Sequence, residues 1–164
     1  MRLWHIDLLP YLPDAQFKGQ LRELVATMHD WRNKGKTNHL LINRVMEYDK
    51  KELTSYFNRY CEVLRKSYKK GVKGGTIVEF LEFAGYRFGT DYLIDDFTSS
   101  AFFTDEYEDK PIFVGWHNKE YLRVCMANLY EKHFFGVGKS RITDEEWQRL
   151  LDGYKAITGE DYET

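Results

Sequence analysis

The sequence predicts an all-α, mainly helical fold in a single compact domain over residues 1–164. Successive segments repeat apolar residues at helical spacing, and several of them begin with a residue that can cap a helix. The 164 residues are 43% hydrophobic, which is enough for one core. The N-terminal dozen residues also carry apolar side chains, and we expect them to form an extended segment packed across the helices: Leu3, Trp4, Ile6, Leu8 and Leu9.

The first two helices are predicted from caps and apolar spacing. Residues 14–31 follow Pro13, which ends the preceding segment, and Asp14 supplies an N-cap. One side of this helix is apolar, through Phe17, Leu21, Leu24, Val25 and Met28. Residues 49–71 form the second helix, in which Asp49 and Glu52 can make a capping box.

The rest of the chain predicts three more helices and one long loop. A short apolar helix covers residues 76–84, and further helices cover residues 118–133 and 143–157, the last with a capping box between Thr143 and Glu146. Between residues 86 and 117 the sequence loses its period and becomes aromatic and acidic, which indicates a long ordered loop with a short strand or helical turn.

Composition limits the classes of function. The chain has no run of about 18 apolar residues and no signal-peptide pattern, so we expect a cytoplasmic, intracellular protein without a membrane partner. Cys61 and Cys125 lack the spacing of a zinc site or disulfide framework, and we expect both to be reduced core residues. We expect no metal ion and no small-molecule cofactor, because the histidines also lack metal-ligand spacing: His29, His39, His117 and His133.

Charge is distributed unevenly along the chain. Residues 1–75 hold 15 Lys and Arg against 8 Asp and Glu, a net charge of +7, whereas residues 76–164 hold 9 against 18, a net charge of −9. This asymmetry is typical of a basic binding face backed by an acidic, solvated one. Random variation in the charge of exposed helices is the alternative.

Glu23 lies away from the apolar side of the first helix. Its neighbours on that opposite face are Gly19 and Ala26, so small residues flank the carboxylate. In one interpretation another segment crosses closely here while Glu23 pairs with a surface Lys or Arg. In the other, the space admits a substrate or the N-terminus itself.

The chain is long enough to bring its start beside Glu23. Twelve extended residues reach about 40 Å, and Glu23 lies only about 14 Å along its helix from Asp14. An α-amine has a pKa of about 8, so part of it is the free base at neutral pH. Such an amine is a competent nucleophile toward an aldehyde-like carbon, and a nearby carboxylate can stabilise the cationic imine and move protons.

A basic segment, HDWRNKGKTNHLLINR, follows the first helix. Its basic residues are spaced to hold consecutive phosphates, although a solvated basic loop is the alternative: Arg32, Lys34, Lys36, His39 and Arg44. Trp116 and His117 could stack on a flipped base, but packing in the core is the simpler interpretation.

The start MRLWHIDLLPYLP, the stretch GQLREL and the basic NKGKTNH resemble the pyrimidine-dimer DNA glycosylase family, of the phage endonuclease V type, over about residues 1–70. The resemblance implies a small helical domain whose N-terminal α-amine attacks C1′ of a damaged nucleotide in a bent duplex with a flipped base. It also implies that Glu23 is catalytic, that Arg22 belongs to the catalytic group, and that Arg2 binds DNA. Because Arg2 is bulky, we expect Met1 to be retained and to carry the amine.

Two functions follow as hypotheses. The first is a DNA repair glycosylase with abasic-site lyase activity on double-stranded DNA, with Met1, Arg22 and Glu23 as catalytic residues. The second is a non-catalytic helical protein that keeps the fold and binds nucleic acid or another partner. Both predict salt-sensitive DNA binding, but only the first predicts a covalent imine.

Overall fold

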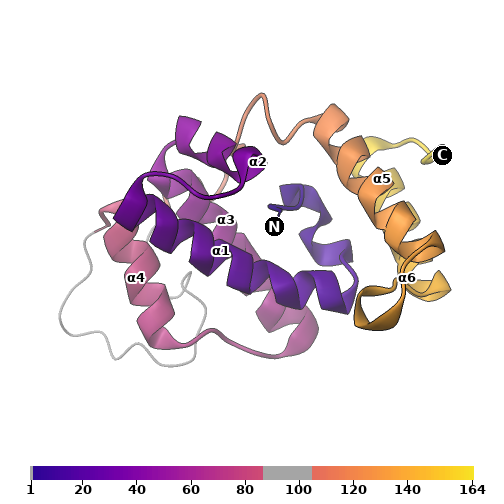
Figure 1. Ribbon diagram of the computed structural model, residues 1–164, viewed down its shortest axis with the longest axis horizontal. Coiled ribbons are helices and arrows are strands. Elements are labelled where there is room, and N and C mark those ends of the chain that lie inside the picture. The colour runs from indigo at the N-terminus through magenta and orange to yellow at the C-terminus, as the bar shows by residue number, and fades with distance from the viewer. Residues whose placement is uncertain (1, 87–104) are drawn as a thin grey trace. The chain divides into compact units, whose positions relative to one another are not determined.

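The structure, a computed structural model, describes residues 2–86 and 105–164 (Figure 1). Every regular element in these two ranges is a helix, so the prediction of an all-α fold is confirmed. The described residues form two compact units. The first unit contains Arg2 and the described part of Leu21–Phe113, and the second contains Leu3–Gln20 and Val114–Thr164. That residues 1–164 form a single domain stays a prediction.

The long helices appear where apolar spacing and caps predict them. They are α1 (Asp14–Lys34), α3 (Lys50–Tyr68), α4 (Gly74–Ala84), α5 (Lys119–Phe134) and α6 (Asp144–Thr158). Capping boxes begin α3 and α6, formed by Asp49 with Glu52 and by Thr143 with Glu146. Asp14, in contrast, is the first residue of α1 rather than its N-cap, and its backbone N donates a hydrogen bond to Glu146 at 3.1 Å.

Short helices complete the described chain, and apolar spacing predicts none of them. They are η1 (Ile6–Tyr11), α2 (Leu40–Asn43), η2 (Arg44–Glu47) and η4 (Gly138–Ser140). Helix η1 corrects the expectation that the first dozen residues are extended. It begins with a local cap, in which the Asp7 backbone N donates to Nδ1 of His5 at 3.1 Å. A helix of one or two turns is too short for periodicity to reveal it.

The predicted loop over residues 86–117 is described only in part. Residues 87–104 lie outside the described residues. Residues 105–117 contain turns and no strand. Here Phe113 is fully buried, and its backbone N donates to the Glu52 carboxylate at 2.9 Å.

In the first unit, α3 and α4 pack against each other around aromatic side chains. The rings of Phe57 and Phe80 stack with their centroids 4.0 Å apart. Leu24 and Met28 of α1 are fully buried in the same unit. Cys61 is buried, as predicted.

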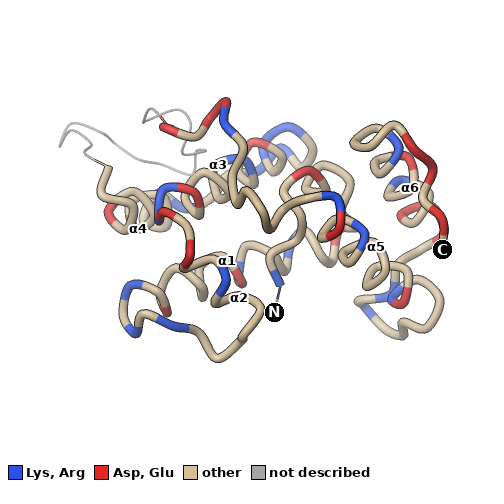
Figure 2. Tube along the Cα trace, turned by 90° about the horizontal axis from the view of Figure 1, so that it is seen from above, with Lys and Arg blue, Asp and Glu red and all other residues tan. Residues whose placement is uncertain are grey.

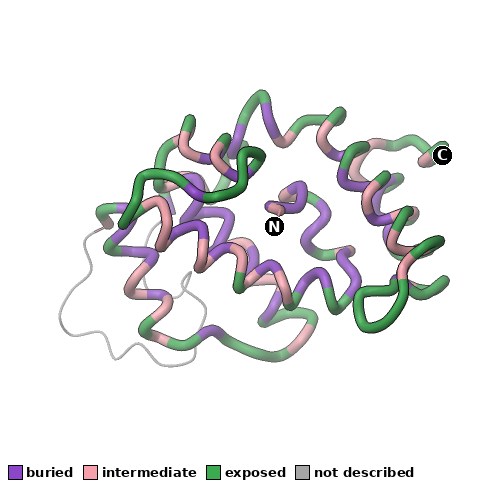
Figure 3. The backbone as a smooth tube through the Cα atoms, viewed as in Figure 1, coloured by how far each residue is buried: buried purple, intermediate pink, exposed green. Residues whose placement is uncertain are grey.

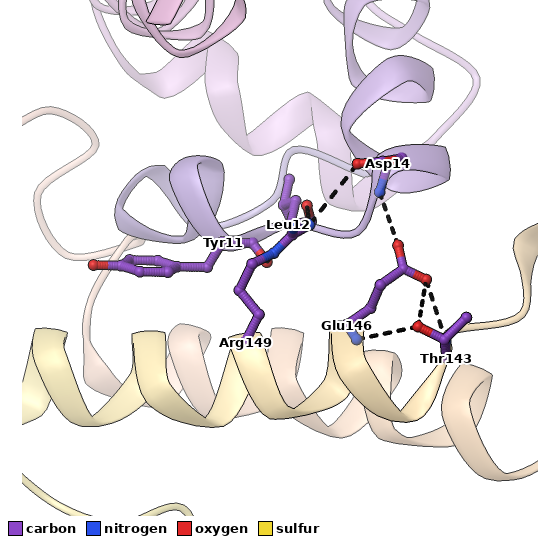
Figure 4. Close-up of polar contacts among 6 residues, drawn as sticks. All are labelled: Tyr11, Leu12, Asp14, Thr143, Glu146 and Arg149. Atoms are coloured by element: carbon purple, nitrogen blue, oxygen red, sulfur yellow. Dashed lines mark hydrogen bonds and ion pairs between the residues drawn. The ribbon is translucent and has the colours of Figure 1, made fainter. Parts of the chain in front are cut away.

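In the second unit, η1 packs on α6 (Figure 4). A Cβ atom on Gly153 would lie 2.4 Å from the Tyr11 ring, so only glycine permits this close approach. Arg149 of α6 donates to the backbone oxygen of Leu12 at 2.6 Å, and Glu146 accepts from Asp14. These bonds hold the start of α1 to α6. No helix in the described ranges is long and apolar enough to cross a membrane.

Candidate active site

Glu23 and Arg2 meet in the first unit. The backbone N of Arg2 donates a hydrogen bond to Oε2 of Glu23 at 3.1 Å, across 21 positions of sequence. Glu23 is half-buried on α1, and Arg2 is half-buried too. A carboxylate that accepts from a backbone N–H makes a charge-assisted hydrogen bond, which is stronger than a bond between neutral groups. The Arg2 backbone therefore lies beside Glu23, and the length of the N-terminal segment permits this position.

The backbone of α1 is tied at this position by a second bond. The hydroxyl of Thr27, which is fully buried, donates to the backbone oxygen of Glu23 at 2.7 Å. Leu24 and Met28 anchor the same turns in the core. Because these neighbours are buried, the Glu23 carboxylate projects from a rigid part of the helix.

The other two residues predicted to be catalytic differ in how they are placed. Arg22 is exposed on α1, next to Glu23 in the chain. Met1 lies outside the described residues. The structure therefore brings Arg2 and Glu23 together and leaves the Arg22 side chain at the surface.

Lys34 lies on the same face of α1 as Glu23. It follows Glu23 by 11 positions, a rotation that returns to nearly the same side of the helix about 16 Å further along its axis. Asp30, on this face as well, lies 3.6 Å from the Lys34 ammonium group. Both side chains are partly exposed, and ion pairs of this kind contribute little to stability. Asp30 therefore holds the Lys34 ammonium group only weakly.

The other basic residues of the predicted segment lie at the end of α1, between α1 and α2, and, for Arg44, at the start of η2 (Figure 2). We call residues 32–44 the basic connection. Lys36 and His39 are exposed, and the Arg44 guanidinium lies 4.0 Å from Glu47. Most of this connection is exposed, as Figure 3 shows in green.

Arg32 shares a carboxylate with His29. Nε2 of His29 lies 2.6 Å from Oε2 of Glu79 on α4, and the Arg32 guanidinium lies 3.3 Å from the same oxygen. The hydrogen bond from His29, helped by Arg32, holds the pKa of Glu79 below its ordinary value of 4.5. Spacing could indicate that His29 and Arg32 share a face, because they are three positions apart. Spacing could not identify Glu79 as their shared partner, because Glu79 lies 47 positions beyond Arg32 in the sequence.

Thr37 and Asn43 hold the basic connection in shape, and sequence reasoning missed both. Asn43 Oδ1 accepts from the Thr37 backbone N at 2.7 Å, and Nδ2 of Asn43 donates to the Thr37 backbone oxygen at 3.3 Å. Thr37 is 5% exposed although its neighbours on both sides are exposed. A threonine and an asparagine among cations carry no periodic signal, so only their local hydrogen-bonding habit could have indicated them.

Other candidate groups have structural roles. Trp116 is 4% exposed and packs edge-on against His117 with ring centroids 4.7 Å apart, as the core interpretation predicts. Both cysteines are buried. Among residues 2–86 and 105–164, no cluster of three His, Cys, Asp or Glu side chains is arranged to hold a metal ion.

The comparisons with known proteins concern the N-terminal part of the chain. The family model described as pyrimidine dimer DNA glycosylase matches residues 1–73 of the 164. No curated protein and no solved structure matches the chain. The matched residues include Arg2, Glu23 and the whole basic connection. The match confirms the resemblance: residues 1–73 are similar to the pyrimidine dimer DNA glycosylase family.

Proposed function

We propose that this protein is a DNA repair glycosylase with abasic-site lyase activity, which acts on pyrimidine dimers in double-stranded DNA. The family match over residues 1–73 supports the glycosylase class and DNA as the substrate. The observation that carries the proposal further is the hydrogen bond between the Arg2 backbone and the Glu23 carboxylate at 3.1 Å. It supports the proposal because Arg2 is the residue joined to the proposed nucleophile.

In this proposal the nucleophile is the α-amine of Met1. The backbone nitrogens of two joined residues lie within about 4 Å of each other in any conformation. The bond from Arg2 to Glu23 therefore limits how far that amine can be from the carboxylate. A lysine is not needed as the nucleophile. An α-amine has a lower pKa than a lysine side chain, so a larger fraction of it is the free base at neutral pH.

The reaction proceeds by two steps that the carboxylate assists. The amine nitrogen bonds to C1′ as the bond from C1′ to the base breaks, and the base leaves with that electron pair and takes the proton that the nitrogen loses. The bond from C1′ to O4′ then opens, O4′ takes a proton from water, and the product is a cationic imine. Glu23 stabilises this cation and takes a proton from C2′, after which the bond to the 3′ phosphate breaks by elimination. Arg22, exposed beside Glu23, binds a phosphate close to the reacting sugar.

The basic connection and Arg2 bind the phosphates of the duplex. We assign this role to Arg2, Arg32, Lys34, Lys36, His39 and Arg44. Three of these cations pair with surface carboxylates, Arg32 with Glu79, Lys34 with Asp30 and Arg44 with Glu47. Exposed pairs are worth about 1 kcal/mol or less, so phosphates can replace the carboxylates.

The test is incubation with a duplex that contains one abasic site, followed by reduction with borohydride. We expect a covalent protein–DNA adduct whose mass and fragmentation place the bond at the residue 1 nitrogen. A form extended by two residues at the N-terminus is the matched comparison, because it keeps the helices and the basic connection. It should give no adduct and should bind the same duplex with unchanged affinity.

Two outcomes would contradict the proposal. Equal trapping by the extended form would show that the α-amine of Met1 is not the nucleophile. Salt-sensitive duplex binding without any adduct would identify the protein as a non-catalytic nucleic-acid-binding relative.

A further inference from the structure

Two adjacent leucines in the basic connection are exposed. Leu40 and Leu41 begin α2 (Leu40–Asn43) and expose 89% and 73% of their surface. The next residue, Ile42, is only 1% exposed, so the same helical turn is anchored in the core of the first unit. Folding usually buries leucine, because contact with water is unfavourable for apolar surface. This turn instead holds its two leucines in solvent.

The turn is rigidly held. Thr37 and Asn43 lie on either side of the leucines in the chain and are joined by three hydrogen bonds, at 2.7, 2.9 and 3.3 Å. Buried Thr37, Ile42 and Val45 fix the connection at both ends. Leu40 and Leu41 are therefore presented on a defined scaffold, which lowers the entropy cost of inserting them into a partner.

Basic residues flank this apolar pair in the sequence. The chain has no Asp or Glu between Asp30 and Glu47, whereas the basic connection contains Lys34, Lys36 and Arg44. A partner that matches this surface must have negative charge close to an apolar interior. Duplex DNA has this combination, because its phosphates flank stacked bases.

We propose that Leu40 and Leu41 form a wedge that inserts into the base stack of a damaged duplex. Lys34, Lys36 and Arg44 hold the neighbouring phosphates, and the leucines fill the gap that opens when a nucleotide leaves the stack. The inference rests on the proposed function and deepens it, since it assigns to α2 the residues that unstack the damaged step. A lesion weakens stacking, so the wedge favours damaged over intact duplex.

The experiment separates unstacking from chemistry. The probe is a duplex with a tetrahydrofuran abasic analogue next to 2-aminopurine, whose fluorescence rises when it is unstacked. Tetrahydrofuran has no aldehyde carbon, so no imine can form. The protein should raise the fluorescence severalfold, and the double variant L40A/L41A should leave it near that of the free duplex. The variant should also lose about tenfold in affinity for the analogue.

Other measurements on the same variant define the effect. Its affinity for undamaged duplex and the slope of that affinity with salt should stay at the values of the unmodified protein, because no cation is removed.

The variant L40M/L41M should restore the fluorescence change, since methionine is apolar and similar in volume to leucine. The matched control is V124A, which trims an aliphatic side chain that is 48% exposed on α5. It should behave like the unmodified protein.

Each outcome bears on one of the two proposals. The wedge is overturned if L40A/L41A unstacks the probe as well as the unmodified protein does. The proposed function still stands in that case, provided that the unmodified protein traps natural abasic sites. If the unmodified protein neither binds nor traps DNA, both are overturned. Sedimentation tests whether the leucines instead contact a second copy of the chain. If the unmodified protein is a dimer, and L40A/L41A is a monomer that still unstacks the probe, the leucines belong to a protein interface and the wedge is overturned.

Discussion

Oε2 of Glu23 accepts a hydrogen bond from the backbone N of Arg2 at 3.1 Å. This one contact joins the first described residue of the chain to a half-buried carboxylate on α1. A bond from a backbone N–H does not depend on the Arg2 side chain, so substitutions other than proline keep the donor. It therefore holds the Arg2 backbone beside Glu23 without using the arginine side chain.

Glu23→Gln should separate chemistry from structure. The amide oxygen of glutamine can still accept from the Arg2 backbone, but the negative charge and the base are lost. We expect strand cleavage at an abasic site to fall about 100-fold or more, with duplex affinity within twofold of the unmodified protein. The control is Glu62→Gln on α3, a partly exposed glutamate that lies 4.0 Å from Arg65. Equal loss of binding and cleavage would indicate that Glu23 has only a structural role.

DNA affinity should depend steeply on salt. If about six phosphates are neutralised, the logarithm of the binding constant should fall against the logarithm of salt concentration with a slope of about −5. Charge reversal in K34E/K36E should flatten this slope by about 2 or more. The variant K119E/K155E makes the same change of charge on α5 and α6, and it should leave the slope nearly unchanged. A slope near zero in the unmodified protein would exclude nucleic acid as the partner.

Glu52→Ala should destabilise the protein more than loss of a cap alone. The Glu52 carboxylate, in a residue 9% exposed, accepts from the Asp49 backbone at 3.1 Å and from the Phe113 backbone at 2.9 Å. Removing it leaves both donors without this acceptor, and we expect the free energy of unfolding to fall by about 2–4 kcal/mol. Asp49→Ala, which removes only the cap, should cost about 1 kcal/mol. Urea denaturation measures both, and equal effects would contradict the role of the Phe113 bond.

The Glu79 carboxylate should make stability depend on pH in the acid range. Because His29 and Arg32 lower its pKa in the folded protein, the folded state binds a proton less readily than the unfolded state. The resulting stabilisation is present above the ordinary pKa of 4.5 and is lost as the pH falls through the lower pKa of the folded state. Glu79→Gln should remove this part of the pH dependence of the melting temperature. Parallel curves for the two proteins below pH 5 would contradict it.

Local sequence determined the long helices of this protein. Apolar side chains every three or four residues, with Asp49 and Thr143 as caps, predict α1, α3, α4, α5 and α6 because both signals act within a few residues of each other. The same local signals placed Glu23 on the face of α1 away from Leu24. The resemblance over residues 1–70 added the chemistry that this face could perform.

Tertiary structure decided which groups meet. The contacts of Glu23 with Arg2 and of Arg32 with Glu79 join residues 21 and 47 positions apart, and many other residues of the same type could have made them. The exposure of Leu40 and Leu41 could not be predicted either, because an apolar pair beside buried Ile42 looks like core. Burial depends on the whole set of packed elements, whereas a cap or an apolar repeat depends only on its own segment. For that reason the helices could be predicted from the sequence, and the partners of their side chains could not.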